Sequence, residues 1–146
     1  MMNTQLYIGI MSGTSMDGAD AVLIRMQGTR WLAAEAHAFA PYGHTLKADL
    51  LDLQHTGSNE LHRSMLLSQQ LSALYAGVTA DLLAQQGLAP ADITAIGCHG
   101  QTVRHAPEAG YSIQLADWAR LAALSGIFTI GDFRSRDLAA GGQGAP

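Results

Sequence analysis

Small and hydroxyl-bearing residues surround one carboxylate between Ser12 and Gly18, where the sequence reads SGTSMDG. Glycines let the backbone turn sharply and approach a ligand closely, and consecutive small residues can direct their N–H groups into one concavity that favours an anion. The hydroxyl groups would add donors for phosphate oxygens, and the carboxylate of Asp17 could hold Mg²⁺, directly or through water. Asp20 could point into the same cleft. The pattern is equally typical of a plain hairpin loop with a capping aspartate, so residue chemistry alone does not decide for phosphate.

Two familiar loop motifs do not fit this stretch. A Walker A loop would continue into a Gly-Lys-Ser/Thr run, which does not follow here. A nucleophile elbow has a Gly-x-Ser-x-Gly pattern that leads into a helix. Here Asp17 replaces the final glycine of that pattern, and the residues that follow favour a strand. A serine hydrolase built from Ser15, His99 and Asp132 therefore stays a weaker alternative.

A second polar stretch, GCHGQTVR at residues 97–104, follows an apolar, strand-like run. Ligand sites favour the strand ends of α/β sheets, and Gln101 and Thr102 carry the donors and acceptors needed to bind sugar hydroxyls. Taken alone, His99 is better explained as a core histidine bonded to backbone. Zinc is not expected, because neither the adjacent Cys98 nor His105 stands at a ligand spacing that would pair with it.

A third stretch, GDFRSRD at residues 131–137, mixes arginines with aspartates. One reading is a surface ion-pair network, which would add little stability. The other is an arginine that grips a carboxylate or phosphate with its bidentate fork. The glycine-rich run GGQG at residues 141–144 either lies under that ligand or is merely flexible.

The apolar pattern predicts the elements that must position these stretches. Short apolar runs closed by turn signals predict strands over residues 6–11, 19–26, 93–98 and 127–130. Residues 31–39 read as a further strand, although their alanines leave a helix open. Helical spacing predicts a short helix capped by Thr45, a long helix ending before Gly87, and a third capped by Asp117. The long helix carries a core-facing stripe of Leu67, Leu71, Leu74, Val78 and Leu82. Together they predict a mixed α/β sheet flanked by helices.

Bulk composition narrows the class of protein. The 146 residues suffice for one domain, and 48% of them are hydrophobic while 14% are charged. A net charge of −4 argues against nucleic-acid binding, which needs a basic face. The lone Cys98 fits a reducing compartment, and the N-terminus has neither a signal peptide nor a membrane span. We expect a soluble, cytoplasmic protein.

Three stretches together closely resemble the anhydro-N-acetylmuramic acid kinases: IMSGTSMDG at 10–18, IGCHGQT at 96–102, and GDFR at 131–134 leading to GGQGAP at 141–146. That family belongs to the sugar kinase, Hsp70 and actin superfamily. The resemblance implies a ribonuclease H-like (actin-like ATPase) core, which in the complete kinase is one of two domains that close over ATP and sugar.

The resemblance also implies the role of particular residues. The first ATP phosphate loop would consist of Gly13, Thr14, Ser15, Met16, Asp17, Gly18, Ala19 and Asp20. Asp17 would lie near Mg²⁺. The residues facing the sugar would be His99, Gly100, Gln101, Thr102 and Arg134. No catalytic base is assigned, because the family has it in a later part of the chain.

The reaction implied is the ATP-dependent phosphorylation of 1,6-anhydro-N-acetylmuramic acid. Water adds at the anomeric carbon and opens the 1,6-anhydro bridge, while the freed 6-oxygen takes the γ-phosphoryl group. The product, N-acetylmuramic acid 6-phosphate, enters peptidoglycan recycling and amino-sugar metabolism. The cofactors would be ATP and Mg²⁺ and the partner a small sugar, with no nucleic acid or membrane and a homodimer left open.

Members of the family are considerably longer than this sequence, which stops within its glycine-rich run. We therefore expect residues 1–146 to be the N-terminal part of a two-domain kinase without its C-terminal domain, and to be inactive alone. A noncatalytic half-domain that binds a sugar or nucleotide is the alternative from another class.

Overall fold

A six-stranded mixed sheet forms the centre of the computed structural model, which describes residues 3–145. The strands are β1 (Thr4–Ser12), β2 (Gly18–Gln27), β3 (Arg30–Pro41), β4 (Ile93–Ala106), β5 (Tyr111–Leu115) and β6 (Thr129–Ile130). Their order across the sheet is β3-β2-β1-β4-β5, and β6 lies beside the first half of β4.

Connection lengths explain the strand directions. Short turns join β1 to β2 and β2 to β3, and both pairs are antiparallel. In contrast, β4 runs parallel to β1, which requires the chain to cross over through helices between them. The expected mixed α/β sheet is confirmed, and residues 31–39 belong to a strand rather than a helix.

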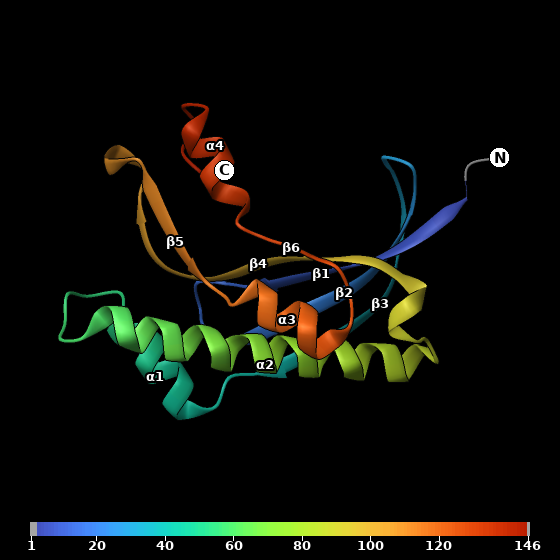
Figure 1. Ribbon diagram of the computed structural model, residues 1–146, viewed down its shortest axis with the longest axis horizontal. Coiled ribbons are helices and arrows are strands. Elements are labelled where there is room, and N and C mark those ends of the chain that lie inside the picture. The colour runs from blue at the N-terminus through green and yellow to red at the C-terminus, as the bar shows by residue number, and fades with distance from the viewer. Residues whose placement is uncertain (1–2, 146) are drawn as a thin grey trace.

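Helices α2 (Glu60–Gln86) and α3 (Trp118–Ser125) lie on one side of the sheet with α1 (His44–Asp52) next to α2, whereas α4 (Phe133–Ala139) lies on the other side (Figure 1). Two short 3₁₀ turns, Pro90–Asp92 and Pro107–Ala109, flank β4. None of the helices in the described residues is long and apolar enough to cross a membrane.

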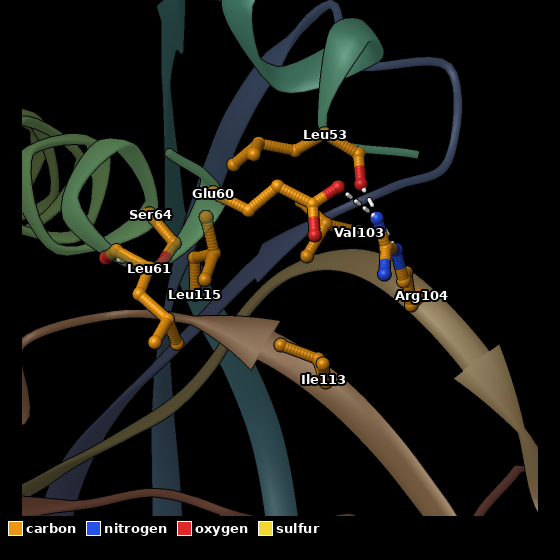
Figure 2. Close-up of a pocket in the computed structure, with 8 residues that line it drawn as sticks. All are labelled: Leu53, Glu60, Leu61, Ser64, Val103, Arg104, Ile113 and Leu115. Atoms are coloured by element: carbon orange, nitrogen blue, oxygen red, sulfur yellow. Dashed lines mark hydrogen bonds and ion pairs between the residues drawn. The ribbon is translucent and has the colours of Figure 1, made fainter. Parts of the chain in front are cut away.

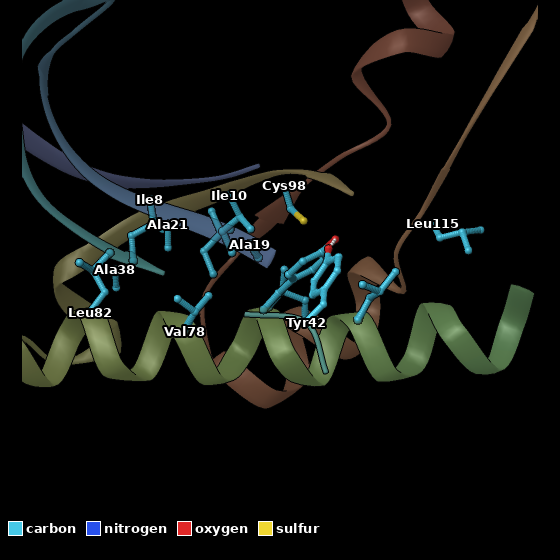
Figure 3. Packing of buried hydrophobic residues seen from close by; sticks show 14 of the residues in the cluster. Ile8, Ile10, Ala19, Ala21, Ala38, Tyr42, Val78, Leu82, Cys98 and Leu115 are labelled. Carbon is cyan, nitrogen blue, oxygen red and sulfur yellow. Dashed lines mark hydrogen bonds between the residues drawn. The ribbon is translucent and has the colours of Figure 1, made fainter. Parts of the chain in front are cut away.

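The core lies between α2 and the sheet. Alanines on β2 and β3 let α2 approach the strands closely, and its side chains meet the isoleucines of β1 (Figure 3). The expected helical stripe is confirmed, with Leu67, Leu71, Val78 and Leu82 buried and Leu74 packed against the cluster at its margin. A left-handed Gly87 ends the helix, as its position after the last periodic residue predicts.

Several local expectations are wrong. Thr45 does not cap α1, because Gly43 occupies the N-cap position and no side chain caps that end. The strand expected to end at Cys98 continues to Ala106, because its second half pairs with the unexpected strand β5. Residues 133–139, for which the sequence pattern predicted no helix or strand, form α4. The last strand is limited to Thr129–Ile130, where it meets β4.

Candidate functional site

The loop between β1 and β2 holds an unusual backbone conformation. Met16 has φ of 52°, in the left-handed region, although it is not glycine, and its side chain is fully buried. Its N–H donates to the carbonyl of Gly13 at 3.1 Å, which closes the turn. A Cβ on Gly18 would lie 2.3 Å from the carbonyl oxygen of Ala40, so only glycine fits there. With Met16 as the internal anchor, Gly13, Thr14 and Ser15 face solvent.

Asp17 is the carboxylate of this loop, and Lys47 is its partner. The Lys47 ammonium, in the first turn of α1, donates to Oδ1 of Asp17 at 2.6 Å. Hydrogen bonds from Lys47 and Ser15 hold the pKa of Asp17 below its usual value, so the group is ionised at neutral pH. The backbone N–H of Tyr42, in the segment between β3 and α1, donates to the carbonyl of Asp17 at 2.9 Å and so joins that segment to the loop. Sequence reasoning missed Lys47, because only the fold brings α1 beside the loop.

The donor set fits Mg²⁺ in one limited sense. Mg²⁺ is commonly held by one or two carboxylates together with water and substrate phosphates, and the exposed, ionised Asp17 could supply one such ligand. Across residues 3–145, no three His, Cys, Asp or Glu side chains are grouped to hold a metal by themselves. Asp20 lies apart from this pair, because its Oδ1 contacts Nε2 of His37 on β3 at 2.7 Å.

The second and third polar stretches meet through His99 and Arg134. Arg134 Nε donates to His99 Nε2 at 3.0 Å, so that ring nitrogen must be an acceptor. The ring proton therefore lies on Nδ1, which donates to the carbonyl of Gly100 at 2.9 Å. A neutral His99 thus orients a guanidinium that is half-buried, the setting in which arginine binds carboxylates and phosphates in bidentate fashion.

Polar residues of β5 extend the hydrogen-bonded pair of His99 and Arg134. Ser112 Oγ accepts from Arg134 Nη1 at 3.4 Å and lies 3.0 Å from His105 Nδ1. Gln114 Nε2 donates to Ser112 Oγ at 2.7 Å and to Thr102 Oγ1 at 3.2 Å. Ser112 and Gln114 were not predicted as site residues, although the alternation of polar and apolar residues in YSIQL has the period of a strand.

Gln101 differs from its neighbours, because its side chain is fully buried and hydrogen-bonded to Tyr42, Gly13 and Thr102. The expected sugar-facing stretch is therefore divided: His99 and Thr102 are half-buried at the surface and Gln101 points into the core.

In the described residues, Ser15, His99 and Asp132 do not form the catalytic triad that a serine hydrolase requires. Ser15 bonds to Asp17, His99 to Gly100 and Arg134, and Asp132 to Ser135, so nucleophile, base and orienting acid are not joined.

A separate, mostly apolar pocket of about 220 Å³ opens between the start of α2 and the β4–β5 hairpin. Figure 2 shows Arg104 directed at Glu60 and at the carbonyl of Leu53 on its rim. Arg104 Nε and Nη2 are engaged in contacts with protein atoms, the rest of the lining is mostly apolar, and none of residues 12–20 lines the pocket.

The structure thus carries a hydroxyl-bearing turn with an ionised carboxylate and, separately, an arginine oriented by His99, both on one mixed α/β sheet; phosphotransferases use such groups to position and neutralise phosphate. Comparison with known proteins identifies the family: the family model described as anhydro-N-acetylmuramic acid kinase matches residues 5–146, and the chain belongs to this family. This membership bears out the resemblance, and the mixed α/β sheet flanked by helices agrees with the fold class that the resemblance implies.

Curated relatives carry the same name. The anhydro-N-acetylmuramic acid kinase of Neisseria gonorrhoeae (strain ATCC 700825 / FA 1090) is 74% identical over 146 residues, which are 100% of this chain and 40% of the relative. That of Nitrosomonas europaea is 54% identical over 142 residues, covering 96% of this chain and 39% of the relative. Among solved structures, YeaZ from Pseudomonas aeruginosa aligns with 91% of this chain and 45% of its own at 14% identity, with a TM-score of 0.31. The chain thus spans about 40% of the length of these curated kinases.

Proposed function

We propose that these residues supply the first phosphate loop and part of the sugar site of an enzyme that phosphorylates 1,6-anhydro-N-acetylmuramic acid with ATP. The observation that carries this proposal is the direct junction of the two candidate sites. Gln101 Nε2 donates to the carbonyl of Gly13 at 3.2 Å, and Ser12 Oγ donates to the carbonyl of Gly100 at 3.2 Å. Phosphoryl transfer depends on holding donor and acceptor together, and this junction supports a site in which the loop binds phosphate and the polar stretch of β4 contributes to the sugar surface.

Each group has a distinct role in this proposal. The exposed N–H and hydroxyl groups of residues 13–15 bind nucleotide phosphate, and Asp17 holds Mg²⁺ through one carboxylate oxygen or a water. Mg²⁺, when bound, would neutralise charge on the transferring phosphoryl group. Arg134, oriented by His99, binds the lactyl carboxylate of the sugar.

The chemistry proposed is a hydrolytic ring opening coupled to transfer. The oxygen of water forms a bond to the anomeric carbon while the bond between that carbon and the bridging 6-oxygen breaks. The freed 6-oxygen bonds to the γ-phosphorus as ADP leaves. The proton lost by water requires a base, which we place outside these residues; we therefore propose that transfer needs the remainder of a full-length kinase. We place the enzyme in the cytoplasm, acting on a free sugar rather than on nucleic acid or membrane, with dimerisation open.

A chimera provides the test, with residues 1–146 replacing the matching part of the Neisseria gonorrhoeae kinase. ADP release that depends on the anhydro-sugar supports the proposal, and the 146-residue chain alone is expected to show none. Binding of sugar or nucleotide by a chimera that never turns over would favour the noncatalytic half-domain instead.

Asp17→Asn in the active chimera should lower kcat by about a hundredfold or more while sugar affinity stays nearly unchanged, because charge neutralisation dominates phosphoryl transfer. Asp81→Asn, an exposed change on α2, is the matched control. An unchanged kcat of the Asp17 variant at saturating Mg²⁺ would contradict the role given to this carboxylate.

A further inference from the structure

A β-bulge redirects the side chain of Gln101 into the core. Cys98 pairs with Ile10, but Gln101 pairs with Ser12, so β4 contains one more residue than β1 over this interval. Gly100, at φ of 76°, absorbs the irregularity, and a Cβ there would lie 2.8 Å from the carbonyl oxygen of Leu115. Because a bulge shifts the alternation of side chains, Cys98 and Gln101 both face inward while His99 faces outward.

The buried amide of Gln101 has defined partners. Its Nε2 donates to the carbonyl of Gly13, the same oxygen that accepts the N–H of Met16 and closes the phosphate loop. Its Oε1 accepts from the Tyr42 hydroxyl at 3.1 Å. The contact with Gly13 fixes the orientation of the amide, because only the NH₂ group can donate to a carbonyl. The amide oxygen is then the acceptor for the Tyr42 hydroxyl.

Beneath this amide lies a second buried junction. The Ser12 hydroxyl lies 2.9 Å from the Tyr75 hydroxyl and also contacts the Gly100 carbonyl, while Tyr42 and Tyr75 lie 3.4 Å apart. Burial raises the pKa of both tyrosines, so their hydroxyl groups stay protonated and available as donors at neutral pH. No buried side-chain nitrogen or oxygen in residues 3–145 lacks a partner, so the network is complete.

We propose that Gln101 is a positioning residue for the phosphate loop, acting through the Gly13 carbonyl and not by contact with the sugar. The inference rests on the proposed function and refines it, because it moves Gln101 from the sugar surface to the support of the nucleotide site. Held from below, the Gly13 carbonyl points into the core, and the N–H groups of the following residues are left to face the ligand. The left-handed conformation of Met16 is maintained by the same contact, as strained backbone requires.

Three variants of the active chimera test the proposal. Gln101→Met keeps the size of the side chain and removes its hydrogen bonds to Gly13, Tyr42 and Thr102. Gln101→Glu keeps an acceptor for Tyr42 and can donate to Gly13 only when protonated. Thr79→Val is the control, because it removes a different buried hydrogen bond, from Thr79 Oγ1 to the Tyr75 carbonyl within α2. All three are compared with the parent for melting temperature and for the KM of ATP and of sugar.

The expected result for Gln101→Met is a rise of roughly tenfold in the KM of ATP with little change in the KM of sugar, the consequence of a loop that no longer presents its donors. Gln101→Glu should regain activity relative to the parent as the pH falls and its carboxyl group is protonated. Thr79→Val should lower the melting temperature comparably without changing either KM. If the KM of sugar alone rises, or if Gln101→Met behaves like Thr79→Val, the proposal is overturned.

A readout independent of catalysis separates this proposal from the proposed function. In the 146-residue chain, Gln101→Met should speed amide hydrogen exchange at Met16 by roughly tenfold relative to core amides of β1, whereas Thr79→Val should not. Unaltered exchange at Met16 would overturn the positioning role. A chimera without sugar-dependent turnover would instead count against the proposed function, and the exchange result would still decide the role of Gln101.

Discussion

The loop between β1 and β2 at residues 12–18 and the C-terminal stretch at residues 131–145 are both glycine-rich, yet they are held in different ways. The loop is attached from below by buried groups, with Met16, Gly18 and Ser12 all inaccessible. In the C-terminal stretch, helix α4 has no buried residue, and the exposed Asp137 accepts from the N–H groups of Gly142 and Gly144.

This difference determines how rigidly each region holds the groups that would contact a ligand. Buried hydrogen bonds open only with a large part of the core, whereas exposed ones open locally at low cost. The loop should therefore be ordered before any ligand arrives, and Arg134 should be adjustable, constrained by His99 and Ser112 alone among its described side-chain contacts.

The largest expected effect comes from Gly18→Ala. The added methyl group would lie 2.3 Å from the Ala40 carbonyl oxygen and 2.5 Å from Cζ of Phe39, and backbone cannot move aside cheaply. We expect the free energy of unfolding to fall by about 3 kcal/mol, at the upper end of overpacking effects. Gly77→Ala, in the middle of α2 with nothing within 4 Å, should instead raise it by about 0.5–1 kcal/mol. Urea unfolding of the chain measures both, and equal effects would show that the loop is not tightly held.

Arg134→Ala in the active chimera should weaken sugar binding about tenfold or more, because a buried Arg–carboxylate hydrogen bond contributes about 1.5–3 kcal/mol. Arg134→Lys, which keeps the charge but loses the fork, should recover part of this loss. Initial rates against sugar and ATP give the two KM values. A change confined to the KM of ATP would place Arg134 at the other ligand.

The buried thiol of Cys98, on β4 beside β1, should make the free energy of unfolding depend on pH in the alkaline range. Burial raises the pKa of Cys98 from 9.0 to about 12, so the folded chain keeps a proton that the unfolded chain loses. Stability from this group is complete below pH 9 and declines as the pH rises toward 12, by up to about 1.4 kcal/mol per pH unit.

Cys98→Ala should flatten that decline while lowering stability at pH 7 through the lost volume. Chemical denaturation at pH 7, 9 and 10 gives the slope. The parent and variant slopes would coincide if Cys98 titrated normally in the fold.

Much of the fold follows from periodicity and turn chemistry, and the exceptions share a cause. The stripe on α2, the Gly87 cap and the Asp117 cap are set by neighbours in sequence, and Asp117 indeed accepts from the N–H of Arg120. The inward turn of Gln101 depends instead on a bulge against β1, a contact between distant segments that no local pattern encodes. Gly100 was the available signal, since an isolated glycine in a strand often marks a bulge.

The sequence predicts which residue types make up the candidate site, but it does not predict the contacts between them. The polar stretches at 12–18, 97–104 and 131–137 were recognised from composition, and their family is confirmed. The contacts of Lys47 with Asp17 and of Arg134 with His99 depend on how α1 and α4 pack, which is determined by tertiary structure.

The smallest expected effect is that of Gly142→Ala, and it tests the comparison most directly. A Cβ on Gly142 would lie 2.1 Å from Oδ2 of Asp137, a distance no longer than the one found at Gly18. Here, however, the obstructing atom ends an exposed side chain that can rotate away, at the cost of its hydrogen bond from the Gly144 N–H. We expect a loss of at most about 1 kcal/mol in the free energy of unfolding, the usual net contribution of one exposed hydrogen bond. Asp137→Ala combined with Gly142→Ala should lose no more than Asp137→Ala alone, because the obstruction is then gone. A loss as large as that of Gly18→Ala would mean that the C-terminal stretch is held as firmly as the loop at residues 12–18, and the contrast between the two regions would be wrong.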